Sequence, residues 1–282
     1  MSEAIKPIDG DLKDINIFDP ELMKCPHALY KKLRDESPVY QDPATGIFQV
    51  SKLELICEAA RNPKVFSNDF GALQKDGGSD DYPQEAADIM MKEGYPSVNT
   101  MLTADPPRHT RYRSLVNKAF SPKLVQGMVP AIQRKTNDII DKFIHTGKCD
   151  VAADIAQQLP IKVIAEALGV SSDYYEDFKV WSKAFTDQLS GTSTPEEHIE
   201  IAKKLVKFQQ FFANQLDEKG KNPADDIISD LATIDFEDEH GVTRKLETAE
   251  QLSIIQQLLV AGNATTAHSI TEAIKLLIEH PE

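Results

Sequence analysis

The chain has little of what marks secreted, zinc-binding or nucleic-acid-binding proteins. It carries three cysteines, and its 31 Lys and Arg are outnumbered by 45 Asp and Glu, which gives a net charge of −14. This charge argues against nucleic acid and against an anionic membrane surface as partners. Cys25, Cys57 and Cys149 are scattered without CxxC spacing, so the sequence indicates neither a zinc site nor a disulfide framework. Reduced cysteines of this kind are typical of a cytosol.

Long apolar runs are absent as well. The most apolar stretch, residues 254–261, is interrupted by Gln256 and Gln257 and is far too short to cross a bilayer. The N-terminus has no basic region followed by an apolar one, so no signal peptide is visible. Hydrophobic residues make up 41% and charged residues 27% of the chain, which is ordinary for a globular protein. We therefore expect a soluble, cytoplasmic protein of a bacterial type, without membrane or nucleic-acid partners.

The periodicity of apolar residues predicts a mainly α-helical fold with a small β-sheet near the N-terminus. Residues 25–36 and 53–61 have helical spacing, and a turn sequence between residues 39–40 and 47–50 predicts a hairpin. Residues 66–100 are irregular, with one helical patch at 84–92, and are expected to form a binding loop. A second short hairpin is expected within 236–246. The remaining helices are expected at 106–119, 122–146, 151–169, 173–190, 195–219, 223–233 and 248–279.

The last of these helices contains an unusual sequence, Ala-Gly-Asn-Ala-Thr-Thr at 261–266. Thr248 and Gln251 suggest a capping box at its start, and its apolar residues cover most of the circumference, as in a buried helix. Gly costs about 1 kcal/mol relative to Ala in a helix interior, so Gly262 calls for a reason. Small residues let either a flat ligand or a neighbouring helix approach closely. In the first case Thr265 would offer a hydroxyl to the ligand.

A second motif, Asp-Pro-Pro-Arg-His-Thr-Arg-Tyr-Arg, occupies residues 105–113. Asp105 is a plausible N-cap, with the two prolines in the first turn. His109 and Arg113 then lie one turn apart on the same helix face. Free N–H groups together with an imidazole and a guanidinium at a helix N-terminus would suit a carboxylate ligand. The alternative is a solvated basic face.

Together these two motifs resemble those of the cytochrome P450 family, and the flanking sequences resemble it along nearly the whole chain. The resemblance implies a P450-like fold with a b-type haem. By this resemblance His109 and Arg113 would bind the haem propionates. Ala261, Gly262 and Thr265 would lie over the distal face of the haem, with Thr265 as the alcohol that hydrogen-bonds iron-bound dioxygen. Residues in the 71–100 loop would line a substrate pocket.

One position departs from the family pattern. Ala264 stands where an acidic residue usually precedes the threonine, so the acid–alcohol pair lacks its acid. We expect Asn263 and Thr265 to hold waters that carry protons instead. The Asn-Ala-Thr sequence also occurs in the branch of the family that reduces nitric oxide, so a nitric oxide reductase-like or peroxide-using haem enzyme is the alternative.

The second departure concerns the haem ligand. No cysteine of this chain has the family's haem-loop context, so the axial cysteine is expected outside this sequence, and no residue here is assigned as a metal ligand. Residues 1–282 are expected to be part of a single cytochrome P450 domain, truncated before that loop. The predicted activity is that of a haem-thiolate monooxygenase, which would hydroxylate a small to medium apolar substrate with O₂ and electrons from a ferredoxin-type partner. A non-catalytic fragment or a helical ligand-binding protein is the rival from another class.

Overall fold

The computed structural model describes residues 8–17, 19–69, 82–190, 193–238 and 241–281. They belong to two compact units, Met1–Ser67 and Asn68–Glu282. Helices dominate, and the strands in the described residues form two separate two-stranded antiparallel sheets. The predicted fold class, mainly α-helical with a small N-terminal sheet, is confirmed.

The first unit is built around a small apolar cluster beneath a hairpin. Strand β1 (Val39–Gln41) pairs with β2 (Phe48–Val50), as the turn sequence predicted. The Tyr40 hydroxyl on β1 donates to the Leu12 carbonyl at 3.0 Å, which ties the hairpin to the N-terminal segment. The other elements of the unit are η1 (Leu12–Asp14), α1 (Pro20–Met23), α2 (His27–Glu36) and α3 (Leu53–Ala60).

The second unit is a helical assembly with one short hairpin, β3 (Asp235–Glu237) with β4 (Thr243–Lys245). Of the irregular stretch predicted at 66–100, residues 70–81 lie outside the described residues and 84–93 form α5. The helical elements are α5 (Gln84–Glu93), α6 (Arg108–Ala119), α7 (Pro122–Ile140), η2 (Ile144–Thr146), η3 (Val151–Ala156), α8 (Gln158–Ala167), η4 (Ser172–Tyr174), α9 (Tyr175–Ser190), α10 (Pro195–Lys221), α11 (Ile227–Thr233) and α12 (Thr248–Glu279).

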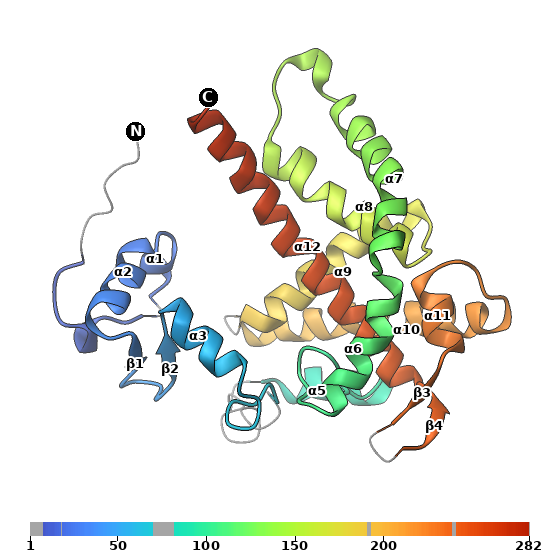
Figure 1. The fold of residues 1–282 in the computed structure, drawn as a ribbon, viewed down its shortest axis with the longest axis horizontal. Coiled ribbons are helices and arrows are strands. Elements are labelled where there is room, and N and C mark those ends of the chain that lie inside the picture. Colours follow the sequence, from blue (N-terminus) through green and yellow to red (C-terminus); the bar gives the residue numbers. More distant parts are fainter. Residues whose placement is uncertain (1–7, 18, 70–81, 191–192, 239–240, 282) are drawn as a thin grey trace. The chain divides into compact units, whose positions relative to one another are not determined.

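Helix α12 is the longest element and organises this unit. Figure 1 shows it as one continuous helix, and it packs against η3, α8, α9, α10 and α11. Its N-terminal half carries buried residues such as Ile254, Ile255 and Leu259. Its C-terminal half is exposed, with Leu277 at 69% and Ile278 at 72% relative accessibility. Ala261 to Thr265 therefore lie where the helix passes from buried to exposed.

Two predicted N-terminal caps are wrong by a small margin. Asp105 is not an N-cap: α6 begins at Arg108, and the Asp105 carboxylate accepts from the Asn68 N–H at 2.9 Å. The prolines at 106 and 107 have no N–H, so a cap at 105 would lack its nearest donors. For α12 the capping box is formed by Glu247 and Glu250, one residue earlier than Thr248 and Gln251. The helix predicted at 151–169 is divided, since η3 is a π-helical turn that precedes α8.

Candidate functional site

The middle of α12 presents small residues on an uncovered face. Ala261 and Thr265 are exposed, whereas Gly262, Asn263 and Ala264 are half-buried. A Cβ added at Gly262 would meet only Ile164 Cδ1, at 3.9 Å, so packing within the described residues does not require a glycine there. The face formed by Ala261, Gly262 and Thr265 is therefore free of bulky side chains. A flat ligand could lie directly on it.

The hydroxyl of Thr265 is oriented by its own helix. Thr265 Oγ1 donates to the Ala261 carbonyl oxygen, one turn earlier, at 2.6 Å. This back-bond is a common arrangement for Thr within a helix. It uses the hydroxyl proton and leaves the oxygen lone pairs free to accept. Thr265 is thus placed to accept a hydrogen bond from a water or a ligand on the exposed face.

Asn263 faces a different neighbour from Thr265. Its Nδ2 donates to Ser182 Oγ on α9 at 2.6 Å, and Ser182 itself is buried. Its Oδ1 is buried and has no hydrogen-bond partner among the described residues. Successive helix positions are about 100° apart, so residues two apart point to nearly opposite sides. The structure therefore does not bring the Asn263 and Thr265 side chains together on one face.

A groove of about 470 Å³ lies between α9 and this part of α12. Asn263 and Ala264 form part of its α12 wall. On the α9 wall, Lys183 and Asp187 make an ion pair at 2.7 Å. The groove is also lined by Ala152, Gln157, Ile161, Lys179, Ser182, Thr186, Ala267, His268 and Thr271. The methyl group of Ala264 thus faces a groove lined by both polar and apolar side chains, and it can neither donate nor accept a proton.

The two residues predicted to bind a carboxylate, His109 and Arg113, lie on α6. His109 is half-buried and Arg113 is exposed, and they are spaced by one helical turn. Among the residues that the structure describes, neither side chain has a hydrogen-bond or ion-pair partner. Both are therefore available to an anionic ligand. The alternative of a purely solvated basic face fits His109 less well, because it is half-buried.

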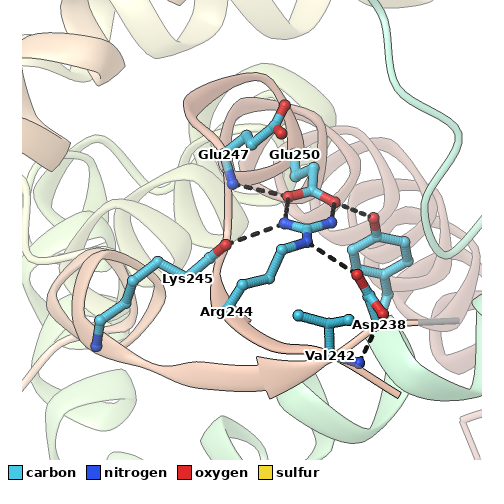
Figure 2. A network of polar contacts seen from close by, with 7 residues as sticks. Asp238, Val242, Arg244, Lys245, Glu247 and Glu250 are labelled. Carbon is cyan, nitrogen blue, oxygen red and sulfur yellow. Dashed lines mark hydrogen bonds and ion pairs between the residues drawn. The ribbon is translucent and has the colours of Figure 1, made fainter. Parts of the chain in front are cut away.

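Between them, Tyr112 is almost fully buried and ties α6 to the start of α12. Its hydroxyl donates to Glu250, and its ring stacks on Phe236 of β3 with centroids 5.6 Å apart. Arg244 of β4 makes a bidentate pair with Glu250, at 2.7 and 2.8 Å. Figure 2 shows this network, in which Asp238 also approaches Arg244 at 3.5 Å. The network joins β3, β4, α6 and α12 around one carboxylate.

The charges in this network stabilise one another. Burial alone would raise the pKa of Glu250, but hydrogen bonds from Arg244, Tyr112 and the Glu247 N–H outweigh it and hold that pKa below its usual value. The hydrogen bond to Glu250 raises the pKa of Arg244. Burial, with the bond to Glu250, raises the pKa of Tyr112. Glu250 therefore stays ionised and Tyr112 stays a hydrogen-bond donor at neutral pH. In the sequence, only a glutamate in the first turn of the helix pointed to this network.

The cysteines do not form a metal site in the part of the chain that is described. Cys25 and Cys149 are exposed and Cys57 is half-buried, and all three thiols are free. The described residues contain no group of three or more His, Cys, Asp or Glu side chains that could hold a metal ion. Across the same residues, no helix combines the length and hydrophobicity that a membrane span requires.

Known proteins resemble this chain in sequence and in fold. Cytochrome P450 YjiB of Bacillus subtilis is 31% identical over 265 residues, which cover 91% of this chain and 59% of that protein. Cytochrome P450 CYP107DY1 of Priestia megaterium is 31% identical over 282 residues, covering 96% and 66%. The crystal structure of the myxobacterial cytochrome P450 CYP267B1 in complex with myristic acid has a TM-score of 0.74 and 31% identity, covering 94% and 63%.

No family model matches the chain. The chain spans roughly 60 to 66% of the length of these relatives, although they cover more than nine-tenths of it. The sequence similarity and the fold similarity each extend over more than nine-tenths of this chain. On these grounds the chain belongs to the cytochrome P450 family.

Proposed function

We propose that the protein is a haem-thiolate monooxygenase that hydroxylates a small to medium apolar substrate with O₂ and electrons from a ferredoxin-type partner. The observation that carries the proposal is the face of small residues formed by Ala261, Gly262 and Thr265, on the helix that Glu250 connects to α6. On α6, neither His109 nor Arg113 has a side-chain partner among the described residues. The haem is inferred from family membership, because cytochrome P450 enzymes carry this cofactor. The known relatives are longer, so we propose that the axial cysteine comes from the part of the family's length that this chain does not span.

The residues present fit a haem. The side chains of His109 and Arg113 have no partner among the described residues, and a haem carries two carboxylates that an imidazole N–H and a guanidinium can bind. Within the part of the chain that the structure describes, no close contact requires a glycine at 262, and Ala261 beside it is exposed, so these two positions offer small side chains to a planar macrocycle. His109 and Arg113 are proposed to hold the propionates, and Ala261, Gly262 and Thr265 to form the distal surface.

When bound, a thiolate-ligated haem supplies the oxygen-activating chemistry, and the protein contributes binding, orientation and protons. Thr265 Oγ1 donates to the Ala261 carbonyl, so its lone pairs can hold a water at the distal surface. Ala264 cannot pass a proton. Asn263 lines the groove between α9 and α12, and its buried Oδ1 has no hydrogen-bond partner among the described residues. We propose that Thr265 and Asn263 act from two sides of the helix, each on water, in place of the missing acid.

An apolar substrate is supported by the names of relatives. A steroid C26-monooxygenase of Mycobacterium tuberculosis is 28% identical and covers 98% of this chain and 62% of that protein. A linalool 8-monooxygenase of Pseudomonas putida is 26% identical. Steroids and linalool are largely hydrocarbon. The net charge of −14 does not oppose such a ligand, since an uncharged substrate is not steered by the field of the protein.

The test is the coupling between reductant and product in the haem-loaded protein. Thr265→Ala removes the hydroxyl and is expected to divert reducing equivalents from product into peroxide. Ala264→Glu serves as the comparison and is expected to change turnover less. The measurement is product formed per NAD(P)H consumed. Unchanged coupling in Thr265→Ala would favour the second candidate, a nitric oxide reductase-like or peroxide-using enzyme, which the methyl group at 264 makes plausible. A reduced, carbon monoxide-bound protein without a thiolate-type Soret band would favour the non-catalytic alternative.

A further inference from the structure

Gln257 is a polar residue in the most apolar part of α12, and it has two partners in a distant segment. Its Oε1 accepts from the Leu102 N–H at 2.8 Å, and its Nε2 donates to Thr100 Oγ1 at 2.7 Å. A half-buried amide among apolar side chains is costly unless it is hydrogen-bonded. Both ends of the Gln257 amide are used. The residue that interrupts the apolar run is therefore explained by the segment it binds.

One turn earlier, Ser253 holds the same segment. Its hydroxyl donates to the Val98 carbonyl at 2.7 Å and lies 3.2 Å from Thr100 Oγ1. Thr100 is completely buried, at 0% accessibility. Two successive turns of α12 thus fix the backbone at residues 98 and 102 and the side chain between them. We call residues 98–102 the clamped segment.

The clamp leads directly to the proposed distal surface. Gln257 precedes Ala261 by four residues and Thr265 by eight, which places it about 6 and 12 Å away along the helix axis. Residues four apart are neighbours on the helix surface, so Gln257 holds the Leu102 N–H within one helical turn of Ala261 along α12. The Leu102 side chain is 53% exposed, whereas Met101 before it is only 6% exposed.

We infer that Gln257 is a specificity-determining positioning residue: its amide fixes Leu102 as a rigid apolar wall beside Ala261 and Thr265. This inference rests on the proposed function, because the ligand that meets the wall is one bound over the haem. A ligand large enough to reach Leu102 gains apolar contact with it. A ligand that occupies only the space at the haem iron does not.

The experiment compares three variants of the haem-loaded protein. Gln257→Leu removes both hydrogen bonds and keeps similar volume. Gln256→Leu is the matched control, because no hydrogen bond to the clamped segment involves Gln256. Leu102→Ala removes the wall, leaves the Leu102 backbone N–H in place, and changes an exposed residue that the fold tolerates.

The first readout is hydrogen exchange and needs no ligand. The Leu102 amide is hydrogen-bonded to Gln257, so its exchange should be accelerated about tenfold in Gln257→Leu, as expected for the loss of about 1.4 kcal/mol of protection. Exchange should be unchanged in Gln256→Leu and Leu102→Ala. Unchanged exchange in Gln257→Leu would overturn the clamp.

The second readout is the affinity for two azoles, followed by the shift of the Soret band. Imidazole is too small to reach the wall, and 4-phenylimidazole carries a ring that can touch it. Gln257→Leu and Leu102→Ala should each weaken 4-phenylimidazole about five- to tenfold, the value of one or two apolar contacts, and leave imidazole within twofold. Equal affinities for 4-phenylimidazole in wild type and both variants would refute the proposal that Leu102 contacts the ligand, even if exchange of the Leu102 amide is accelerated. A wild-type protein whose Soret band responds to neither azole would contradict the proposed function instead, and the exchange readout would still decide the clamp.

Discussion

Replacing Glu250 by Gln tests whether the network of Figure 2 holds α6 against α12. Each carboxylate oxygen of Glu250 accepts from two donors: Arg244 Nη2 and Tyr112 on one oxygen, Arg244 Nη1 and the Glu247 N–H on the other. Glutamine has nearly the same shape, but it places an NH₂ group where one of these oxygens was. In either orientation two donors then face a donor. The charge that balances Arg244 is lost as well.

The expected cost follows from burial. Removing one partner of a fully buried ion pair costs about 3–5 kcal/mol. The Glu250 side chain is only 5% exposed, but that of Arg244 is 31% exposed and water can hydrate part of it. We therefore expect Glu250→Gln to lower the free energy of unfolding by about 2–3 kcal/mol. Tyr112→Phe removes one hydrogen bond to a charged acceptor and leaves no donor unmatched, so it should cost less, about 1.5 kcal/mol.

The difference in the free energy of unfolding between wild type and Glu250→Gln should depend on pH. The pKa of Glu250 in the folded protein is lower than its ordinary value, so its contribution to stability is present above the unfolded-state pKa of about 4.3. That contribution is lost as pH falls from this value through the lowered pKa of the folded state. Glutamine does not titrate. The gap between wild type and Glu250→Gln should therefore be constant near neutral pH and narrow below about pH 4.

Urea unfolding followed by tryptophan fluorescence would measure both effects. The chain has a single tryptophan, Trp181, which is 5% exposed in the aromatic core of the same unit as the network. Wild type, Tyr112→Phe and Glu250→Gln would be compared at neutral pH and in steps down to pH 3. If Tyr112→Phe cost as much unfolding free energy as Glu250→Gln or more, the destabilisation expected from an NH₂ group facing two donors in Glu250→Gln would be refuted. A difference in unfolding free energy between wild type and Glu250→Gln that does not narrow in acid would refute the conclusion that the ionised Glu250 carboxylate stabilises the fold.

Three further outcomes are expected. Arg113→Ala should speed haem transfer to an acceptor protein and leave product identity unchanged, because the side chain is proposed to hold a carboxylate only; altered regiochemistry at full haem occupancy would contradict this. Gly94→Ala should lower the unfolding temperature, since its Cβ would lie 2.7 Å from the Met90 carbonyl oxygen, and overpacking of this kind costs about 1–3 kcal/mol; an unchanged melting curve would show that the backbone adjusts freely. Replacing all three cysteines by Ser should leave the thiolate-type Soret band of the haem-loaded protein intact, and loss of that band would place the ligand among Cys25, Cys57 and Cys149.

The succession of helices and hairpins could be predicted from the sequence because it depends on local periodicity. The bounds Thr248–Glu279 agree with the structure, and both hairpins occur where turn residues separate β-prone runs. The residues that cap the helix starts could not be predicted in the same way. The capping box at Glu247 depends on Glu250, whose side chain is also held by Arg244 and Tyr112, and that competition is invisible to a local pattern.

The sequence by itself also determined which residues are candidates for the site: the small residues at 261–266 and the basic residues at 109 and 113 stand out by type and spacing alone. Only the tertiary structure decided what they face. Thr265 lies on the exposed side of α12, whereas the Asn263 side chain donates to Ser182, because helix geometry separates the two residues and packing determines which side each one occupies. The partners of Gln257 lie about 155 residues away, so no spacing rule could pair them. Local pattern sets the elements, and long-range burial sets the contacts, because a polar side chain takes whichever partner the fold brings within hydrogen-bond distance.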